Sequence, residues 1–344
     1  MKKVLKILLL TSVLFLSATL GACLDLFKQQ NVQTYQISFV QEGQKTIVKS
    51  YKMGDGLDKN VQPVQPTDTT LVTKWNAPDD YVVGGDAQIT AITYSKGLEF
   101  SQYFDSFKRY EVVNYSGTAE KVIIPAYYKG LPVTQIAENR SDTIYGVFKK
   151  NTSVKEVVLP EGLTCIKQYA FNGCTNLSKI NLPSTLEVVE NHAFVDCNFN
   201  VEKFVVPNAT LGERSFFGFK ANTLIIEEGV TIIPNYCFAG KTGILQNVVL
   251  PYSLTNISGL AFWMQPIENI YYCGDEGDFY NLTIGEESYR EENFENYLYE
   301  GAMRYKFGET EEIFIKPTLY YYSENTPEYD GNFWRYVNGV PTKW

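Results

Sequence analysis

A repeat of 22 to 24 residues through the middle of the chain constrains the fold more than any other feature of the sequence. Its clearest column is an Ala-Phe-like pair, with the Phe at positions 148, 171, 194, 216, 238 and 262. A strand-like apolar run that ends in Pro follows in most repeats, as in Val157–Pro160. A unit of about 23 residues cannot bury its own apolar face, so we expect the repeats to stack into a solenoid.

The strand of one repeat shows which kind of solenoid to expect. Leu177–Leu182 has the spacing L-x-x-I-x-L, and residues 170–183 read Ala-Phe-x-x-Cys-x-x-Leu-x-x-Ile-x-Leu-Pro. This pattern resembles the BspA-type leucine-rich repeats. The resemblance covers residues 110–273 and implies a β-rich solenoid with parallel strands and short turns, in which one Phe ring per turn stacks on the next. The chain departs from the pattern at Glu138–Tyr145, a polar insertion, and at Asn208–Leu211, where a turn is shortened.

One column of the predicted sheet points away from the core, two positions before each Pro or its replacement. We call it the outward column, and its members are Ile123, Val158, Asn181, Val205, Ile225, Val249 and Tyr271. Most of its members are apolar, whereas the column two positions earlier is polar. An apolar stripe beside a polar one is a candidate protein-binding surface. The alternative is that β-branched residues favour strands and shield one another.

The N-terminus has the three zones of an export signal. Lysines at positions 2, 3 and 6 precede an apolar run from Ile7 to Leu20. This run is shorter than the roughly 20 residues of a spanning helix, so we interpret residues 1–22 as a signal peptide. It ends in Leu20-Gly-Ala-Cys23, which resembles the lipobox of bacterial lipoproteins and implies that Cys23 is acylated and anchors an exported chain to a membrane. The alternative is an ordinary secretory signal with a chance Cys.

The segments that flank the repeats differ from them. After a tether at 23–33, residues 34–95 alternate polar and apolar positions and contain Gly54, Pro66 and Trp75. They resemble the internalin-type B repeat, or Listeria-Bacteroides repeat, which implies a small β-grasp-like module. We expect residues 96–109 to be a connector. Residues 274–344 are acidic and then aromatic, and we expect them to cap the exposed edge of the last repeat strand.

The sequence holds little that indicates catalysis. His192 is the single histidine, and its place just before an Ala-Phe pair favours a solvent-facing turn residue over a catalytic base. Nucleotide-binding, zinc-protease and hydrolase motifs are absent from the sequence. The acidic run Asp275–Asp278 lacks the spacing of an EF-hand. Carboxylate pairs for glycoside hydrolysis have no motif to support them. We expect no enzyme, no cofactor and no metal site.

Five cysteines follow Cys23, and most of them fall within the repeats. They are Cys165, Cys174, Cys197, Cys237 and Cys273, without CxxC spacing. Cys174 and Cys197 share one column, three residues after the Phe. Buried Cys packs as a small apolar side chain, so a reduced and packed pair is favoured over a disulfide.

Charge and resemblance together limit the partners. A net charge of −9 disfavours nucleic acid, because a polyanionic surface repels phosphates. The BspA-type resemblance implies a cell-surface protein that adheres to an extracellular host or matrix protein, which is our first hypothesis. The alternatives are a structural spacer in the envelope and a glycan-binding protein that uses tail aromatics such as Tyr320–Tyr322 and Trp334.

Overall fold

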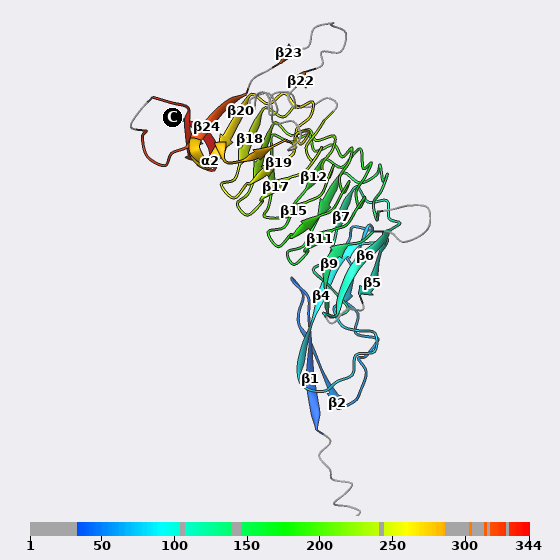
Figure 1. The fold of residues 1–344 in the computed structure, drawn as a ribbon. Coiled ribbons are helices and arrows are strands. Elements are labelled where there is room, and N and C mark those ends of the chain that lie inside the picture. The colour runs from blue at the N-terminus through cyan, green and yellow to red at the C-terminus, as the bar shows by residue number, and fades with distance from the viewer. Residues whose placement is uncertain are drawn as a thin grey trace, which may run out of the picture. The chain divides into compact units, whose positions relative to one another are not determined.

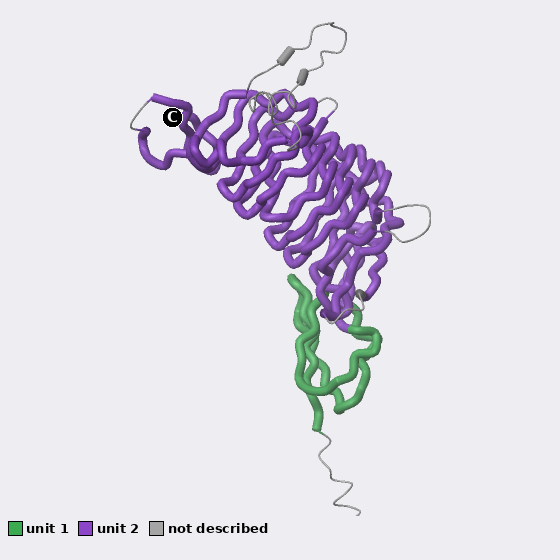
Figure 2. The backbone as a smooth tube through the Cα atoms, in the orientation of Figure 1, with its two compact units in different colours: residues 1–62, 78–91 green, residues 63–77, 92–344 purple. Residues whose placement is uncertain are grey.

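The computed structural model describes residues 33–103, 107–138, 146–240, 244–285, 303–304, 313–314, 317–327 and 330–344. Two compact units divide the chain, residues 1–62 with 78–91 and residues 63–77 with 92–344 (Figure 2). Cys23 and the signal peptide lie outside the described residues. Within the described ranges, no helix is long and apolar enough to cross a membrane.

Unit 1 is built on the strands β1 (Thr34–Val40), β2 (Ile47–Lys52) and the first part of β4 (Ala87–Ser95). β1 pairs antiparallel with β2 and parallel with β4. Ile37 and Phe39 are buried while Gln36 and Ser38 are not, which is the alternation expected of a strand with one covered face. The strands expected in this segment are confirmed, and its assignment as an internalin-type B repeat remains a prediction.

Unit 2 is a stack of turns, each of which contributes short strands to two sides of the stack (Figure 1). Sheets on the first side contain β7 (Lys121–Ile123), β10 (Glu156–Val158) and β12 (Lys179–Ile180), followed by β14 (Lys203–Val206), β16 (Thr223–Ile226), β18 (Asn247–Leu250) and β20 (Asn269–Tyr272). Sheets on the second side contain β9 (Leu131–Ile136), β11 (Cys165–Ile166), β13 (Val188–Val189) and β15 (Thr210–Leu211), followed by β17 (Ile232–Ile233), β19 (Asn256–Ile257) and β21 (Thr283–Ile284). The predicted class, a leucine-rich-repeat solenoid with parallel strands and short turns, is confirmed.

Additional strands complete the N-terminal end of unit 2. β3 (Leu71–Trp75) pairs with β4, and β5 (Leu98–Tyr103) pairs antiparallel with β6 (Arg109–Tyr115), which lies beside β9. β8 (Tyr127–Tyr128) forms a short antiparallel pair with β9. Part of the segment expected to be a connector therefore forms a strand of the repeat unit.

The repeated Phe forms a continuous stack through the core of unit 2. Successive ring centroids are 4.8 Å apart for Phe148 and Phe171, 5.0 Å for Phe171 and Phe194, and 5.1 Å for Phe194 and Phe216. The stack continues to Phe238 and Phe262 at 5.4 and 5.7 Å. The interplanar angles of these pairs do not exceed 14°. The expected stacking of one ring per turn is confirmed.

A left-handed residue precedes five of the six Ala-Phe-like pairs; the pair Ala261-Phe262 is the exception. Tyr169, His192, Arg214 and Tyr236 have φ between 54° and 60°, and Gly146 has φ 94° at the equivalent position. A Cβ on Gly146 would meet the carbonyl of Tyr169, so the first of these turns requires glycine.

The C-terminal residues extend the second of the first-side sheets. β24 (Thr318–Tyr322) pairs parallel with β20, β25 (Phe333–Val337) pairs with the end of β24, and β26 (Val340–Lys343) returns antiparallel to β25. The short helix α2 (Glu276–Tyr280) follows β20, and β22 (Met303–Arg304) pairs with β23 (Ile313–Phe314). β24 thus occupies the edge that β20 would otherwise expose.

Candidate functional site

The sheet β12-β10-β7 presents an ordered polar row on its outward face. Lys121, Glu156 and Lys179 lie opposite one another on the three strands. The carboxylate of Glu156 is 3.0 Å from the ammonium of Lys121 and 3.3 Å from that of Lys179. The pKa of Glu156 is lowered, mainly by its hydrogen bond with Lys121 and to a smaller extent by Lys179. The row is therefore charged at neutral pH, with two cations around one anion.

The outward column begins next to this row with an open part. Ile123 and Val158 lie opposite each other on β7 and β10, two residues after Lys121 and Glu156, and both are half-buried. At the next turn, Asn181 is exposed, but its side chain is hydrogen-bonded to the backbone of Leu159. It accepts from the amide of Leu159 at 2.8 Å and donates to the carbonyl of the same residue at 2.7 Å. The Asn181 side chain therefore links its own turn to the backbone of the preceding turn.

The other end of the outward column is covered. Val249 is 0% exposed and Tyr271 is 6% exposed, and they form a separate apolar cluster with Ile225, Tyr320 and Trp334. Trp334 comes from β25; its ring centroid is 5.4 Å from that of Tyr271. Its indole Nε1 donates to the carbonyl of Tyr272 at 2.9 Å. The outward column thus changes from an open surface to a small second core along the solenoid.

The β25–β26 hairpin covers this part because it folds back across the sheet. At its tip, the carbonyl of Gly339 accepts a hydrogen bond from Lys203 of β14 at 3.4 Å. In β26, the ammonium of Lys343 donates to Asn269 of β20 at 3.0 Å and lies 4.5 Å from the ring centroid of Tyr320. The hairpin therefore contacts residues at both ends of the strand series β14 to β20.

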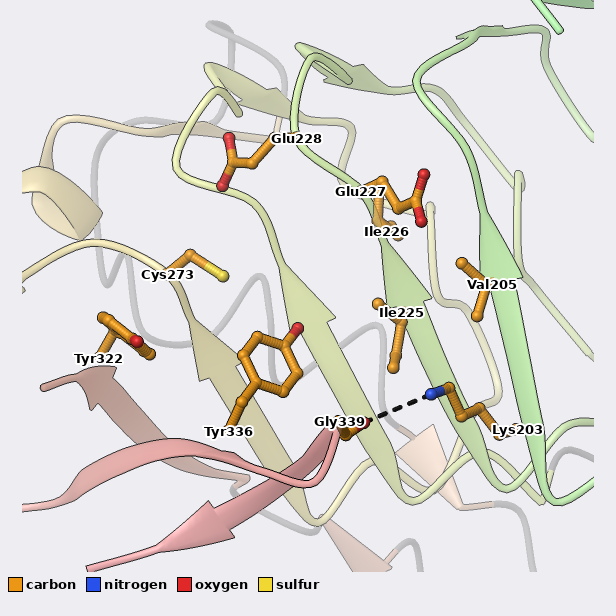
Figure 3. A pocket seen from close by; sticks show the side chains of 10 residues that line it. All are labelled: Lys203, Val205, Ile225, Ile226, Glu227, Glu228, Cys273, Tyr322, Tyr336 and Gly339. Atoms are coloured by element: carbon orange, nitrogen blue, oxygen red, sulfur yellow. Dashed lines mark hydrogen bonds between the residues drawn. The ribbon is translucent and has the colours of Figure 1, made fainter. Parts of the chain in front are cut away.

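A cavity of about 660 Å³ remains between the hairpin and the sheet (Figure 3). Outward-column residues Val205 and Ile225 line it from the sheet, and Tyr336 lines it from the hairpin. The remaining lining residues are Lys203, Ile226, Glu227, Glu228, Cys273, Tyr322 and Gly339.

Charge is unevenly distributed around the cavity. The pKa of Tyr336 is raised to about 12. Burial is the main cause, followed by the nearby Cys273 and the carboxylates of Glu228 and Glu227. Burial, and then Glu228, raise the pKa of the Cys273 thiol to about 12. Phenol and thiol therefore stay neutral at pH 7, and the two glutamates form an anionic end. Glu228 accepts from the amides of Tyr252 at 2.7 Å and Ser253 at 3.1 Å, which fixes its carboxylate.

Comparison with known families agrees with this architecture. Residues 143–268 and 203–289 match the model of the BspA type leucine rich repeat region, with six copies. This part of the chain is similar to BspA-type leucine-rich repeats, and the match covers less than half of the chain. Leucine-rich-repeat proteins are typically binding or scaffold proteins, which suggests a protein-binding or surface-repeat role. No curated protein matches the chain.

Several solved structures with leucine-rich repeats are similar to part of the chain. The leucine rich repeat protein TpLRR of T. pallidum is 23% identical, with a TM-score of 0.41 over 55% of this chain and 79% of that one. A leucine rich cell surface protein of Faecalibacterium prausnitzii is 23% identical, with a TM-score of 0.44 over 57% of this chain and 50% of that one. The pneumococcal vaccine antigen PcpA is 17% identical, with a TM-score of 0.38 over 57% and 46%. The chain thus spans about half the length of the last two.

His192 belongs to the turn structure of the repeats. It occupies the left-handed position, and its ring centroid is 5.1 Å from that of Tyr169 in the preceding turn. Burial, and then the neighbouring Arg214, lower the pKa of His192. The expected turn position is confirmed, although the side chain is half-buried and not fully solvent-facing.

The acidic run Asp275–Asp278, after the last repeat strand of the first side, starts α2. Asp275 accepts from the amide of Asp278 at 2.8 Å, and Asp278 accepts from the amide of Asp275 at 3.3 Å, which together form a capping box. Both carboxylates are used by the helix end. In the part of the chain that the structure describes, no group of three His, Cys, Asp or Glu side chains is placed to hold a metal ion.

The outward column of the repeats was predictable from the sequence, whereas the cavity was not. Its sheet side comes from periodic positions, whereas Tyr336 and Gly339 come from the aperiodic tail. One signal was available: Trp334 and Tyr336 alternate in a short run that ends at Asn338-Gly339, and Asn-Gly is a strong hairpin turn. Nothing in that run indicates which surface the hairpin covers.

Proposed function

We propose that this protein is a cell-surface lipoprotein that binds an extracellular protein through the open part of its outward face. The observation that carries the proposal is the pair Ile123 and Val158, half-buried and adjacent to the fixed Lys121–Glu156–Lys179 row. Protein interfaces combine an apolar centre with a polar rim. Here both parts lie on regular strands, so a partner would meet side chains that are already ordered.

Export and anchoring complete the proposal. A lipid on Cys23 would hold the chain at a membrane surface, with the repeats outside the cell. The acyl chains supply this attachment because each buried methylene contributes about 0.8 kcal/mol. Adhesion to a host or matrix protein is the role we propose for the repeats in that position.

A binding panel with two variants tests this function. The whole protein is presented to immobilised matrix proteins and glycans, and Val158→Glu is compared with Ile232→Glu. Ile232 is 51% exposed on β17, on the other side of the turns, and serves as the matched control. A charge at the centre of a packed contact should weaken binding at least about tenfold, while Ile232→Glu should leave it unchanged.

The same panel separates the alternatives. Equal binding by the wild-type protein and Val158→Glu, with equal thermal unfolding, would place the contact elsewhere. No binding to any protein or glycan would favour the envelope spacer. Glycan hits without protein hits would favour a glycan-binding protein; they would require aromatic rings other than Tyr320 and Trp334, which are buried.

A further inference from the structure

We propose that the cavity under the β25–β26 hairpin binds a lysine or arginine side chain of the partner protein. The inference rests on the proposed function and deepens it by naming a specificity site. It joins three features of the cavity: an apolar floor, an aromatic wall and an anionic end. Each matches one part of a long basic side chain.

The floor and wall suit the aliphatic stem of such a side chain. Val205 and Ile225 are branched aliphatic residues on adjacent strands, where they pair directly with each other. The ring of Tyr336 lines the cavity from the hairpin (Figure 3). Basic side chains pack their methylene groups on apolar surfaces and keep the charged head at a polar boundary. A volume of about 660 Å³ is large enough for one such side chain and its hydration water.

The anionic end suits the charged head. Glu227 and Glu228 lie in the turn after β16, and both act electrostatically on the phenol of Tyr336. Tyr322 and Tyr336 add aromatic faces, which also attract cations. A bound ammonium or guanidinium would therefore meet two carboxylates and aromatic rings.

The lysine already in the cavity does not neutralise this end. Lys203 pairs with Thr223 in register, so the backbone of Glu227 lies four residues further along the strand direction, about 13 Å from that of Lys203 at 3.3 Å per residue. The Lys203 ammonium is instead directed to the carbonyl of Gly339, as Figure 3 shows. The Lys203 ammonium therefore lies at the Gly339 end of the cavity and not at the glutamate end.

The position of the cavity favours a protein side chain over a free amine. Val205 and Ile225 are members of the outward column, so the cavity lies on the same series of turns as the open pair Ile123 and Val158. A partner that lies along the column would place residues over both. The cavity would then select for a basic residue at one position of that partner.

Short peptides test the chemistry directly. The whole protein in detergent micelles is titrated with N-acetylated, C-amidated Gly-Lys-Gly and Gly-Arg-Gly, and with the matched peptides that carry norleucine or acetyl-lysine. Binding is followed by saturation-transfer NMR on the peptide signals. We expect the Lys and Arg peptides to bind and the two neutral peptides to bind at least about fivefold more weakly, because only the former carry a charge. Equal binding by the norleucine peptide would overturn the inference.

Three variants locate the site. Glu227→Gln and the double variant Glu227→Gln/Glu228→Gln should weaken the Lys peptide at least about fivefold. The control is Glu161→Gln, since Glu161 holds the turn position equivalent to Glu228, bonds Ser184 of the next turn and lies outside the cavity. An equal loss in the control, or no loss in the double variant, would overturn the inference.

The two proposals fail separately in these experiments. If a panel protein binds through Val158 and the double variant keeps full affinity for both that protein and the Lys peptide, the cavity inference is overturned and the proposed function stands. If Glu227→Gln weakens binding of the Lys peptide while Val158→Glu changes the binding of no panel protein, the cation site is supported and the proposed contact at Val158 is overturned.

Discussion

At the scale of single residues, the repeats owe their order to one phenylalanine per turn. The ring of Phe171 lies between those of Phe148 and Phe194, and its side chain is 0% exposed. A smaller side chain would leave a void bounded by two rings that cannot close on each other, because the spacing of the strands sets their separation.

We therefore expect Phe171→Ala to lower the free energy of unfolding by about 3–5 kcal/mol. Urea denaturation followed by circular dichroism measures this loss. The matched control is Phe107→Ala, since Phe107 is 77% exposed, and it should change stability by no more than about 1 kcal/mol. Similar effects of the two substitutions would show that the stack does not stabilise the solenoid.

The repeat thiols also take their properties from the core. Cys174 and Cys197 are buried and donate from Sγ to the carbonyls of Phe148 at 2.9 Å and Phe171 at 3.2 Å. The packed arrangement expected from their shared column is confirmed, and all five described cysteines are free. Burial raises the pKa of Cys237 to about 12 and that of Cys165 to about 11.

These thiols should resist alkylation while the protein is folded. At pH 8, iodoacetamide should leave Cys174, Cys197 and Cys237 unmodified in the native protein and modify them after unfolding in urea, because all three are buried. For Cys197 and Cys237, burial also raises the pKa, and the thiolate is the reactive form. Peptide mass spectrometry measures the modification at each site. Rapid labelling of the native protein would contradict the packed arrangement of these thiols.

The raised pKa values of Cys165 and Cys237 also predict that the folded protein becomes less stable above pH 9. The unfolded thiols ionise first, so unfolding is increasingly favoured as the pH rises from about 9 toward 11 or 12.

At the scale of secondary-structure elements, the C-terminal hairpin converts part of an exposed face into core. Three aromatic side chains meet there: Tyr271 from β20, Tyr320 from β24 and Trp334 from β25. The ring centroids of Tyr271 and Tyr320 are 5.3 Å apart. Without the hairpin, the outward faces of β18 and β20 would present a contiguous apolar patch to water.

Trp334→Ala should release this hairpin while the repeats stay folded. We expect faster amide hydrogen exchange in β24, β25 and β26, greater binding of a hydrophobic dye, and a local loss of about 3–5 kcal/mol. Tyr127→Ala is the control, because Tyr127 is 49% exposed on β8, which does not pair with the hairpin. Unchanged exchange in β24 and β25 of the Trp334 variant would mean that the indole does not hold the hairpin.

At the scale of the whole molecule, the proposed anchor determines where the repeats operate. Cys23→Ala removes the side chain that would be acylated. We expect the variant to move from the detergent phase to the aqueous phase in Triton X-114 partitioning of cells, because a protein without acyl chains has no membrane attachment. Cys273→Ala, which leaves Cys23 intact, is the control. Retention of the Cys23 variant in the detergent phase would exclude lipid anchoring at that residue.

The sequence by itself determined the features that recur. A period near 23 residues with fixed Phe, aliphatic and Pro columns allows few arrangements other than stacked turns, so the parallel strands, the ring stack and the direction of the outward column were all predictable. His192 and Cys174 were understood for the same reason, since each occupies a repeated position.

Only the tertiary structure decided which parts of the outward column are accessible. Val158 and Val249 hold equivalent positions in their repeats, yet the first is half-buried and the second is 0% exposed. The difference comes from the β25–β26 hairpin, whose Trp334 lies 85 residues beyond Val249 in sequence. Local periodicity encodes which way a side chain points, because the turn geometry repeats. It does not encode which distant segment packs on that side chain, and that contact separates the open surface, the cavity and the covered core.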